Sequence, residues 1–182
     1  AVEALDGIAV AHDAGVVHRD LKPANLFLAD ENGGRVCKVL DFGIAKFLEP
    51  DGAGASMAGR LEPTAPGMIV GSPRYMSPEQ ARAERVDARS DIYSMGCVLF
   101  AMITGRSPFD DCRGLVEFCL AHNQKQPPRL GVTLGRAVPE QLEAIVARCL
   151  EKDPERRYAN ARELAAELRS FAASTGAVPA AS

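Results

Sequence analysis

The sequence lacks tryptophan, contains only three histidines, and has no CxxC pair among its five cysteines. The histidines are too scattered along the chain for their spacing to indicate a metal site. An odd number of cysteines without paired spacing indicates neither a disulfide framework nor a zinc site. Four of the five stand among apolar or helix-forming residues, so we expect buried, reduced thiols and a cytoplasmic location.

Long apolar runs are missing too. Residues 95–103 form the best stretch, which falls far short of the roughly 18 apolar residues that mark a transmembrane helix. No charged-then-apolar leader opens the sequence, although the parent protein could be anchored through segments not present here. The net charge of -3 is unlike the basic surface of a nucleic-acid-binding protein. We therefore expect no membrane contact within this segment and no nucleic-acid partner.

The composition is that of a folded globular domain. Apolar residues make up 47% and charged residues 25% of the 182 residues, and a chain of this length can bury a substantial core. Residues 173–182 belong to an Ala, Ser, Pro and Gly run that resembles a linker, which leaves 1–172 as one domain. The sequence opens with Ala inside an apparent helix, so we interpret it as a fragment.

The first forty residues combine one helical pattern with two short strand patterns. Leu5 and Ile8 recur at helical spacing, and Gly15 suits the end of that helix. The β-type runs at 26–28 and 36–40 flank a turn rich in Asn and Gly, which predicts a hairpin.

The rest of the chain predicts a long loop followed by helices. Residues 49–68 have no periodicity and are rich in Gly, Pro, Ala and Ser. A helix start is predicted at 77–80, where Ser can cap and Gln can reach back. Residues 90–104 are apolar on nearly every face, which predicts a buried central helix. Further helices are expected after Pro139 and after a capping box at 160–163.

Four polar residues near the hairpin form a chemically suggestive set. Asp20 stands on a loop five residues before Asn25, and Asp41 follows the hairpin. Such oxygen donors suit Mg²⁺, which binds through one or two carboxylates together with substrate phosphates. Lys22 adds a positive charge beside Asp20. Phosphoryl transfer depends mainly on positioning and charge neutralisation, so this set favours that reaction.

Three ordered motifs carry a family resemblance over residues 1–172. They are His18-Arg19-Asp20-Leu21-Lys22-Pro23-Ala24-Asn25, Asp41-Phe42-Gly43 and Ser77-Pro78-Glu79. Together they resemble the signature set of the serine/threonine protein kinases, particularly the bacterial, Hanks-type branch. The resemblance implies an α+β protein-kinase-like fold. It implies a mainly helical C-terminal lobe with short β-hairpins at the catalytic and magnesium loops, and with the N-terminal lobe absent.

The resemblance implies a role for each matching residue in the reaction. Asp20 matches the catalytic base, and Lys22 matches the residue that stabilises the γ-phosphate. Asn25 and Asp41 match the metal ligands, so the expected cofactors are ATP and Mg²⁺, with Mn²⁺ as an alternative. Phe27 matches the side chain under the adenine ring. A further residue, Ser72, would hydrogen-bond Asp20 and Lys22.

Other matches imply structural roles. His18 and Phe42 match members of a packed hydrophobic spine, and Gly43 completes the second motif. Asp91 matches a carboxylate that hydrogen-bonds the backbone of the catalytic loop. Glu79 is expected to form a buried bridge with Arg157.

Two residues are expected to act in regulation. Arg19 matches the side chain that binds a phosphate on the activation loop. Among the acceptors Ser56, Thr64 and Ser72, we favour Thr64.

The motifs imply proteins with Ser or Thr acceptors as substrates, and self-association for autophosphorylation. Ala24 and Met76 stand where kinases that prefer basic substrates, or Pro after the acceptor, carry other residues. We therefore expect neither a preference for basic substrates nor a requirement for Pro. The Gly-rich loop and strand lysine of the family are not in these 182 residues, which predicts little activity for them alone. The alternatives are a non-catalytic pseudokinase scaffold and a small-molecule phosphotransferase with a kinase-like fold.

Overall fold

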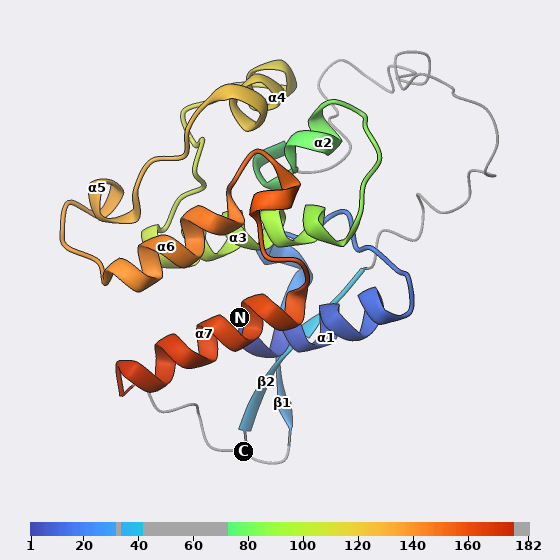
Figure 1. The fold of residues 1–182 in the computed structure, drawn as a ribbon, viewed down its shortest axis with the longest axis vertical. Helices are drawn as coiled ribbons and strands as arrows, with labels where there is room; N and C mark the ends of the chain where they lie inside the picture. The colour runs from blue at the N-terminus through green and yellow to red at the C-terminus, as the bar shows by residue number, and fades with distance from the viewer. Residues whose placement is uncertain (32–33, 42–72, 177–182) are drawn as a thin grey trace.

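The computed structural model describes residues 1–31, 34–41 and 73–176. This part of the chain is mainly helical, with one antiparallel sheet of two strands (Figure 1). In chain order the elements are α1 (Val2–Asp13), β1 (Leu26–Glu31), β2 (Gly34–Val39), α2 (Pro78–Ala81), α3 (Ala88–Thr104), α4 (Leu115–Gln124), α5 (Leu130–Leu134), α6 (Glu140–Cys149) and α7 (Ala161–Ser174). Single 3₁₀ turns occupy Pro23–Asn25, Pro73–Tyr75 and Pro154–Arg156.

Helix α3 is the central element of the core, as its apolar pattern predicts. Asp87 caps its start by accepting the Arg89 N–H, and Gly105 ends it in a left-handed conformation. Helix α6 packs closely against it at Gly96, where an added Cβ would lie 2.6 Å from Cβ of Cys149. Eleven consecutive residues of α3 are buried, so this helix is the frame on which the other elements assemble.

Helices α1 and α7 lie side by side (Figure 1) and share one hydrophobic core with α3 and α6. The Asn160 side chain caps α7 by accepting the Glu163 N–H at 3.0 Å. Glu163 reaches back to the N–H of Ala159 and not to that of Asn160, so the expected capping box is only half formed. Helix α7 continues to Ser174, two residues beyond the domain end expected from composition.

The hairpin forms where the sequence predicts it, with longer strands than expected. Its register pairs Leu26, the first residue of β1, with Val39, the last residue of β2. The residue just before β1 and the residue just after β2 therefore lie next to each other. The backbone N–H of Cys37 donates to Glu3 Oε2 at 2.7 Å, which fixes β2 against α1. The hairpin therefore has a set position relative to the helical core.

Helices α4 and α5 have no counterpart in the sequence predictions. Phe118 and Ala121 of α4 pack with Phe109 in a second, smaller core cluster. Within the described ranges, no helix is long and apolar enough to cross a membrane.

The expectation of buried thiols needs correction. All five cysteines are free, as expected, but only Cys97 and Cys149 are fully buried. The other three lie on a strand, a loop and the partly exposed helix α4, where apolar neighbours in the sequence do not imply burial.

Candidate functional site

The loop between α1 and β1 begins at a well-defined helix end. Gly15 has a φ of 75° and donates to the His12 carbonyl, while the Val16 N–H donates to the Ala11 carbonyl. This pair of bonds is the Schellman motif, which only a residue at ease with positive φ supports. The chain therefore leaves α1 in a fixed direction toward His18.

The start of this loop is anchored on Asp91, in the first turn of α3. The backbone N–H groups of His18 and Arg19 donate to the two Asp91 carboxylate oxygens at 2.8 and 2.9 Å. His12 Nε2 donates to the same carboxylate at 2.8 Å. Asp91 is almost completely buried, so its charge needs these donors. The sequence predicted the backbone contacts of Asp91 but not the contribution of His12.

Arg19 connects the loop to α2. Its φ of 66° is a left-handed conformation that costs a non-glycine residue roughly 1–3 kcal/mol. Its carbonyl accepts a hydrogen bond from Gln80 Nε2 at 2.7 Å. Gln80 also closes the capping box predicted at the start of α2, because its Oε1 accepts the Ser77 N–H at 2.9 Å. One side chain thus caps α2 and holds the loop, a contact that the sequence did not predict.

Asp20 and Lys22 form a partly exposed ion pair. Lys22 Nζ lies 2.7 Å from Asp20 Oδ2, and the two side chains are 24% and 33% exposed. Asn25 Nδ2 donates to the Asp20 carbonyl at 2.9 Å, and the Asp20 N–H donates to His18 Nδ1 at 3.3 Å. These bonds hold the backbone on both sides of the Asp20 carboxylate while leaving the carboxylate accessible.

The hairpin brings Asp41 to the same loop. The Leu40 N–H donates to the Asn25 carbonyl at 2.9 Å, and the Leu40 carbonyl accepts from His18 Nε2 at 3.0 Å. Because His18 Nε2 donates, its Nδ1 is the acceptor that receives the Asp20 N–H. Asp41 follows directly, exposed and with a left-handed φ of 52°.

The donor chemistry of this cluster suits a hard cation. The nitrogen of the Asn25 carboxamide is used by the loop, and in the described part of the chain its Oδ1 has no hydrogen-bond partner. The exposed Asp41 carboxylate likewise has none there. An amide oxygen and a carboxylate are ligands that Mg²⁺ accepts. No cluster of three or more His, Cys, Asp or Glu able to hold a metal exists among the described residues.

Glu79 and Arg157 meet in the buried pair that the sequence predicted. The guanidinium donates to Glu79 Oε1 at 2.8 Å and to Oε2 at 3.0 Å, and both side chains are at most 5% exposed. Ser90 Oγ also donates to Glu79. Burial alone would raise the pKa of Glu79, but the hydrogen bonds from Arg157 and Ser90 outweigh it and lower that pKa.

Of the five predicted site residues that remain, only Phe27 belongs to the described part of the chain. Phe27 lies on β1 with its side chain 55% exposed. Four predicted residues, Phe42, Gly43, Thr64 and Ser72, lie outside the described residues.

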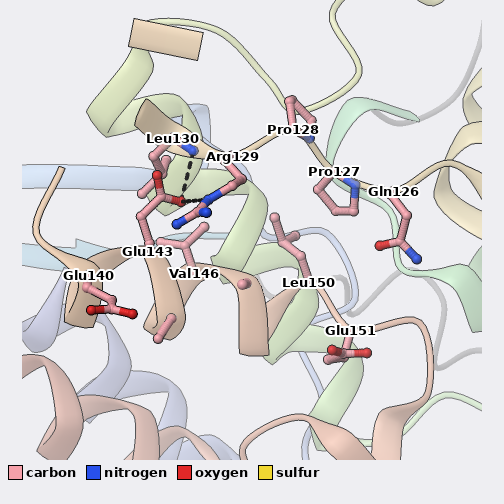
Figure 2. Close-up of a pocket in the computed structure, with 12 residues that line it drawn as sticks. Gln126, Pro127, Pro128, Arg129, Leu130, Glu140, Glu143, Val146, Leu150 and Glu151 are labelled. Carbon is pink, nitrogen blue, oxygen red and sulfur yellow. Dashed lines mark hydrogen bonds and ion pairs between the residues drawn. The ribbon is translucent and has the colours of Figure 1, made fainter. Parts of the chain in front are cut away.

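A groove of about 340 Å³ lies between residues 126–130 and α6 (Figure 2). None of the predicted site residues lines it. Glu143 points across it and accepts the N–H groups of Leu130 and Gly131 at 3.0 and 2.7 Å. These bonds satisfy the start of α5, so we assign Glu143 a structural role and place the candidate site at the Asp20 loop.

Comparison with known proteins supports the motif assignment. The sequence pattern of the family described as "Protein kinase domain" matches residues 1–168. Serine/threonine-protein kinase Pkn1 of Myxococcus xanthus is 43% identical over 156 residues, which cover 85% of this chain and 21% of Pkn1. Serine/threonine-protein kinase PksC of Streptomyces coelicolor is 41% identical over 177 residues, 97% of this chain and 30% of PksC. Serine/threonine-protein kinase PknB of Mycolicibacterium smegmatis is 38% identical over 167 residues, 91% of this chain and 24% of that kinase.

The chain therefore spans between about a fifth and a third of the length of these relatives. The match extends over nearly the whole chain and includes the Asp20 loop, the hairpin and the Glu79–Arg157 pair. The chain belongs to the protein kinase family, in its bacterial, Hanks-type serine/threonine branch.

Proposed function

We propose that this chain supplies the catalytic loop, metal ligands and substrate platform of an ATP-dependent protein serine/threonine kinase. The observation that carries the proposal is the convergence of Asp20, Lys22 and Asn25 on one loop, with Asp41 held beside it through Leu40. We further propose that 1–172, together with the last residues of α7 up to Ser174, form the C-terminal lobe, and that the rest of 173–182 leads into a linker.

In the proposed reaction, the hydroxyl oxygen of a substrate Ser or Thr attacks the γ-phosphorus of ATP. The bond from that phosphorus to the bridging oxygen breaks, ADP leaves, and the hydroxyl proton passes to the Asp20 carboxylate. Lys22 holds one Asp20 oxygen, which leaves the other to receive the proton. Its ammonium also neutralises negative charge on the transferred group, a role that needs only proximity and a positive charge.

We assign Asn25 and Asp41 as the residues that hold the divalent cation, Mg²⁺ or alternatively Mn²⁺. When bound with ATP, the cation neutralises the phosphate oxygens and orients the γ-phosphate. The anchoring of Leu40 by His18 and Asn25 sets where Asp41 stands relative to the loop. Phe27 is assigned to the adenine ring, and its exposed face on β1 is consistent with an aromatic platform.

We assign regulation and substrate contact to the segment that follows the hairpin. Ser72 would hydrogen-bond Asp20 and Lys22, and phosphorylated Thr64 would pair with Arg19 through charge-assisted hydrogen bonds. The substrates would be proteins with Ser or Thr acceptors, including a second copy of the kinase during autophosphorylation. We place the reaction in the cytoplasm, where ATP is available and the five free thiols stay reduced.

The test of this proposal replaces Asp20 by Asn in the full-length protein. Transfer of γ-phosphate to a generic Ser/Thr protein substrate should fall by about 10²–10⁴-fold, the usual contribution of a general base. Nucleotide binding and thermal unfolding should change little, because the Asp20 side chain is accessible and its carbonyl contact is kept. Asp30→Asn, an exposed change on β1, is the matched control.

Three outcomes would count against the proposal. A wild-type protein that binds ATP without transferring phosphate would indicate a pseudokinase scaffold. Transfer only to small molecules would indicate a small-molecule phosphotransferase. Equal activity of the Asp20→Asn variant and the wild type would remove Asp20 as the base. We also expect the 182 residues on their own to transfer little or no phosphate.

A further inference from the structure

The segment Pro73–Tyr75 lies just before the cap of α2 and is held from three sides. Ser94 Oγ of α3 donates to the Tyr75 carbonyl at 2.7 Å. The Arg74 guanidinium pairs with Asp110. His122 of α4 lies with Nε2 3.0 Å from the Pro73 carbonyl. Side chains of α3 and α4 thus hold the backbone of this segment, and the Arg74–Asp110 pair adds a side-chain contact from the turn at Asp110.

His122 has no freedom to turn in its site. It is completely buried, and its ring lies edge-on to Tyr93 and Phe109, with centroids 5.6 and 5.0 Å away. Phe118 stacks near it at 6.4 Å. A buried aromatic cage of this kind orients the imidazole, so the direction of each ring nitrogen is fixed by packing.

The hydrogen bonds around His122 fit only one assignment of the hydrogen on its ring. A carbonyl can only accept, so Nε2 of His122 carries the hydrogen and donates to Pro73. Nδ1 is then bare and accepts from the Tyr93 hydroxyl at 3.0 Å. The Tyr93 oxygen in turn accepts from Lys152 Nζ at 3.1 Å. Lys152, Tyr93, His122 and Pro73 thus form one directed chain across the interior.

The pKa values of His122 and Lys152 agree with this direction of hydrogen bonding. Burial, and then the charge of Lys152, lower the pKa of His122 to about 4, so its ring is neutral at pH 7. Burial also lowers the pKa of Lys152 to about 8, which leaves it mostly protonated at pH 7 and able to donate. Four other charged groups lie close to these hydrogen bonds: Arg157, whose guanidinium carbon lies 4.9 Å from the Tyr93 ring, its partner Glu79, Glu151 near Lys152, and Arg74 on the segment itself.

We propose that His122 is a positioning residue for substrate binding: it fixes the backbone of Pro73–Tyr75, and Tyr93 and Lys152 fix His122. The inference rests on the kinase function proposed above, since it assigns this segment to the substrate platform. In the described part of the chain, the contacts of His122 are with Tyr93, Phe109, Phe118 and Pro73 and not with the residues assigned to the reaction. It acts through the Pro73 carbonyl, one residue after Ser72 and four before the Ser77 cap.

The first experiment compares His122→Leu with His122→Gln in the full-length kinase. The Leu variant should raise the KM for a peptide substrate about five- to tenfold, as expected for one lost buried hydrogen bond, with the KM for ATP unchanged. The Gln variant should restore the peptide KM to within about twofold of wild type, because a carboxamide offers a similar donor and acceptor pair. Gln124→Ala, an exposed change on the same helix, is the control.

A second measurement does not depend on activity. Hydrogen exchange followed by mass spectrometry should show the amides of Arg74–Met76 exchanging about tenfold faster in the Leu variant than in wild type. Protection should return in the Gln variant. Tyr93→Phe, which deletes one oxygen atom from a fully buried ring, should give a smaller acceleration in the same peptide.

The outcomes separate the two proposals. A wild-type protein without kinase activity, but with the expected exchange pattern, would refute the proposed function and leave the His122 contact supported. An active wild type with unchanged peptide KM and unchanged exchange in His122→Leu would overturn the inference. A uniform loss of thermal stability in His122→Leu that His122→Gln does not rescue, with peptide KM and ATP KM rising together, would also overturn it.

Discussion

Removal of Arg157 should destabilise the fold far more than removal of its partner Glu79. The guanidinium makes the bidentate contact with Glu79 and also donates to three backbone carbonyls, those of Glu151, Arg89 and Lys152, at 2.8, 3.0 and 3.1 Å. Breaking a buried ion pair from one side costs about 3–5 kcal/mol. Each buried carbonyl left without a donor adds about 1 kcal/mol or more.

For Arg157→Met the expected loss is therefore about 6–8 kcal/mol, comparable to the whole stability of many domains. Glu79→Gln keeps the three carbonyl contacts and still accepts from Arg157, so we expect about 3 kcal/mol, or a drop in Tm of roughly 10 °C. Urea unfolding and scanning fluorimetry would measure both variants. Arg156→Met, the exposed neighbour, should lie within about 0.5 kcal/mol of wild type.

Two results would contradict the expected difference between Arg157→Met and Glu79→Gln. If Arg157→Met and Glu79→Gln lose the same stability, the carbonyl contacts contribute nothing measurable and the ion pair alone explains both. If neither variant loses more than the Arg156→Met control, the buried pair does not stabilise the fold at all.

Three further predictions concern pH and packing. Because the pKa of Glu79 is lowered below its usual 4.5, the stability that the Glu79 carboxylate contributes should be complete above pH 4.5 and should disappear as the pH falls through the folded-state pKa. Between pH 6 and pH 3, Tm should therefore fall less in Glu79→Gln than in the wild type. Burial lowers the pKa of Lys152 from its usual 10.5 to about 8, so Lys152→Met should raise Tm at pH 7. For the same reason, wild-type stability should increase with pH between 8 and 10.5. An unchanged Tm of Lys152→Met at pH 7 would contradict a cost of burying the Lys152 charge. Gly96→Ala places a methyl group 2.6 Å from Cys149 Cβ and should cost about 1–3 kcal/mol in urea unfolding, whereas Gly7→Ala on the exposed side of α1 should not.

Features that depend on neighbouring residues in the sequence could be predicted. The Ser77–Gln80 capping box, the hairpin and the buried α3 each have a local pattern, and each is confirmed by the structure. Helix α4 was missed because Val116 and Leu120 point to solvent, so its apolar residues do not gather on one face. Helix α5 is only five residues long and offers no periodicity.

Contacts between distant residues could not be predicted without the family resemblance. His12 and Asp91 are 79 residues apart, and Gln80 and Arg19 are 61 residues apart. A single polar side chain has no periodic signal, and its partner is decided only when helices pack. The motifs supplied the partners of Asp91 and Glu79, whereas His12, Gln80 and the Lys152–Tyr93–His122 chain lie outside those motifs.

The anchoring of the Asp20 loop on Asp91 links the proposed catalytic site to the interior of the domain. Two backbone N–H groups of the loop donate to one carboxylate, and that carboxylate belongs to α3, in which eleven consecutive residues are buried. A core substitution that shifts α3 by a fraction of an ångström would move Asp91, and would therefore change the position and direction of the Asp20 side chain. The proposed kinase activity should therefore respond to changes in core packing more sensitively than the melting temperature does, and random core variants should lose turnover before they lose their fold.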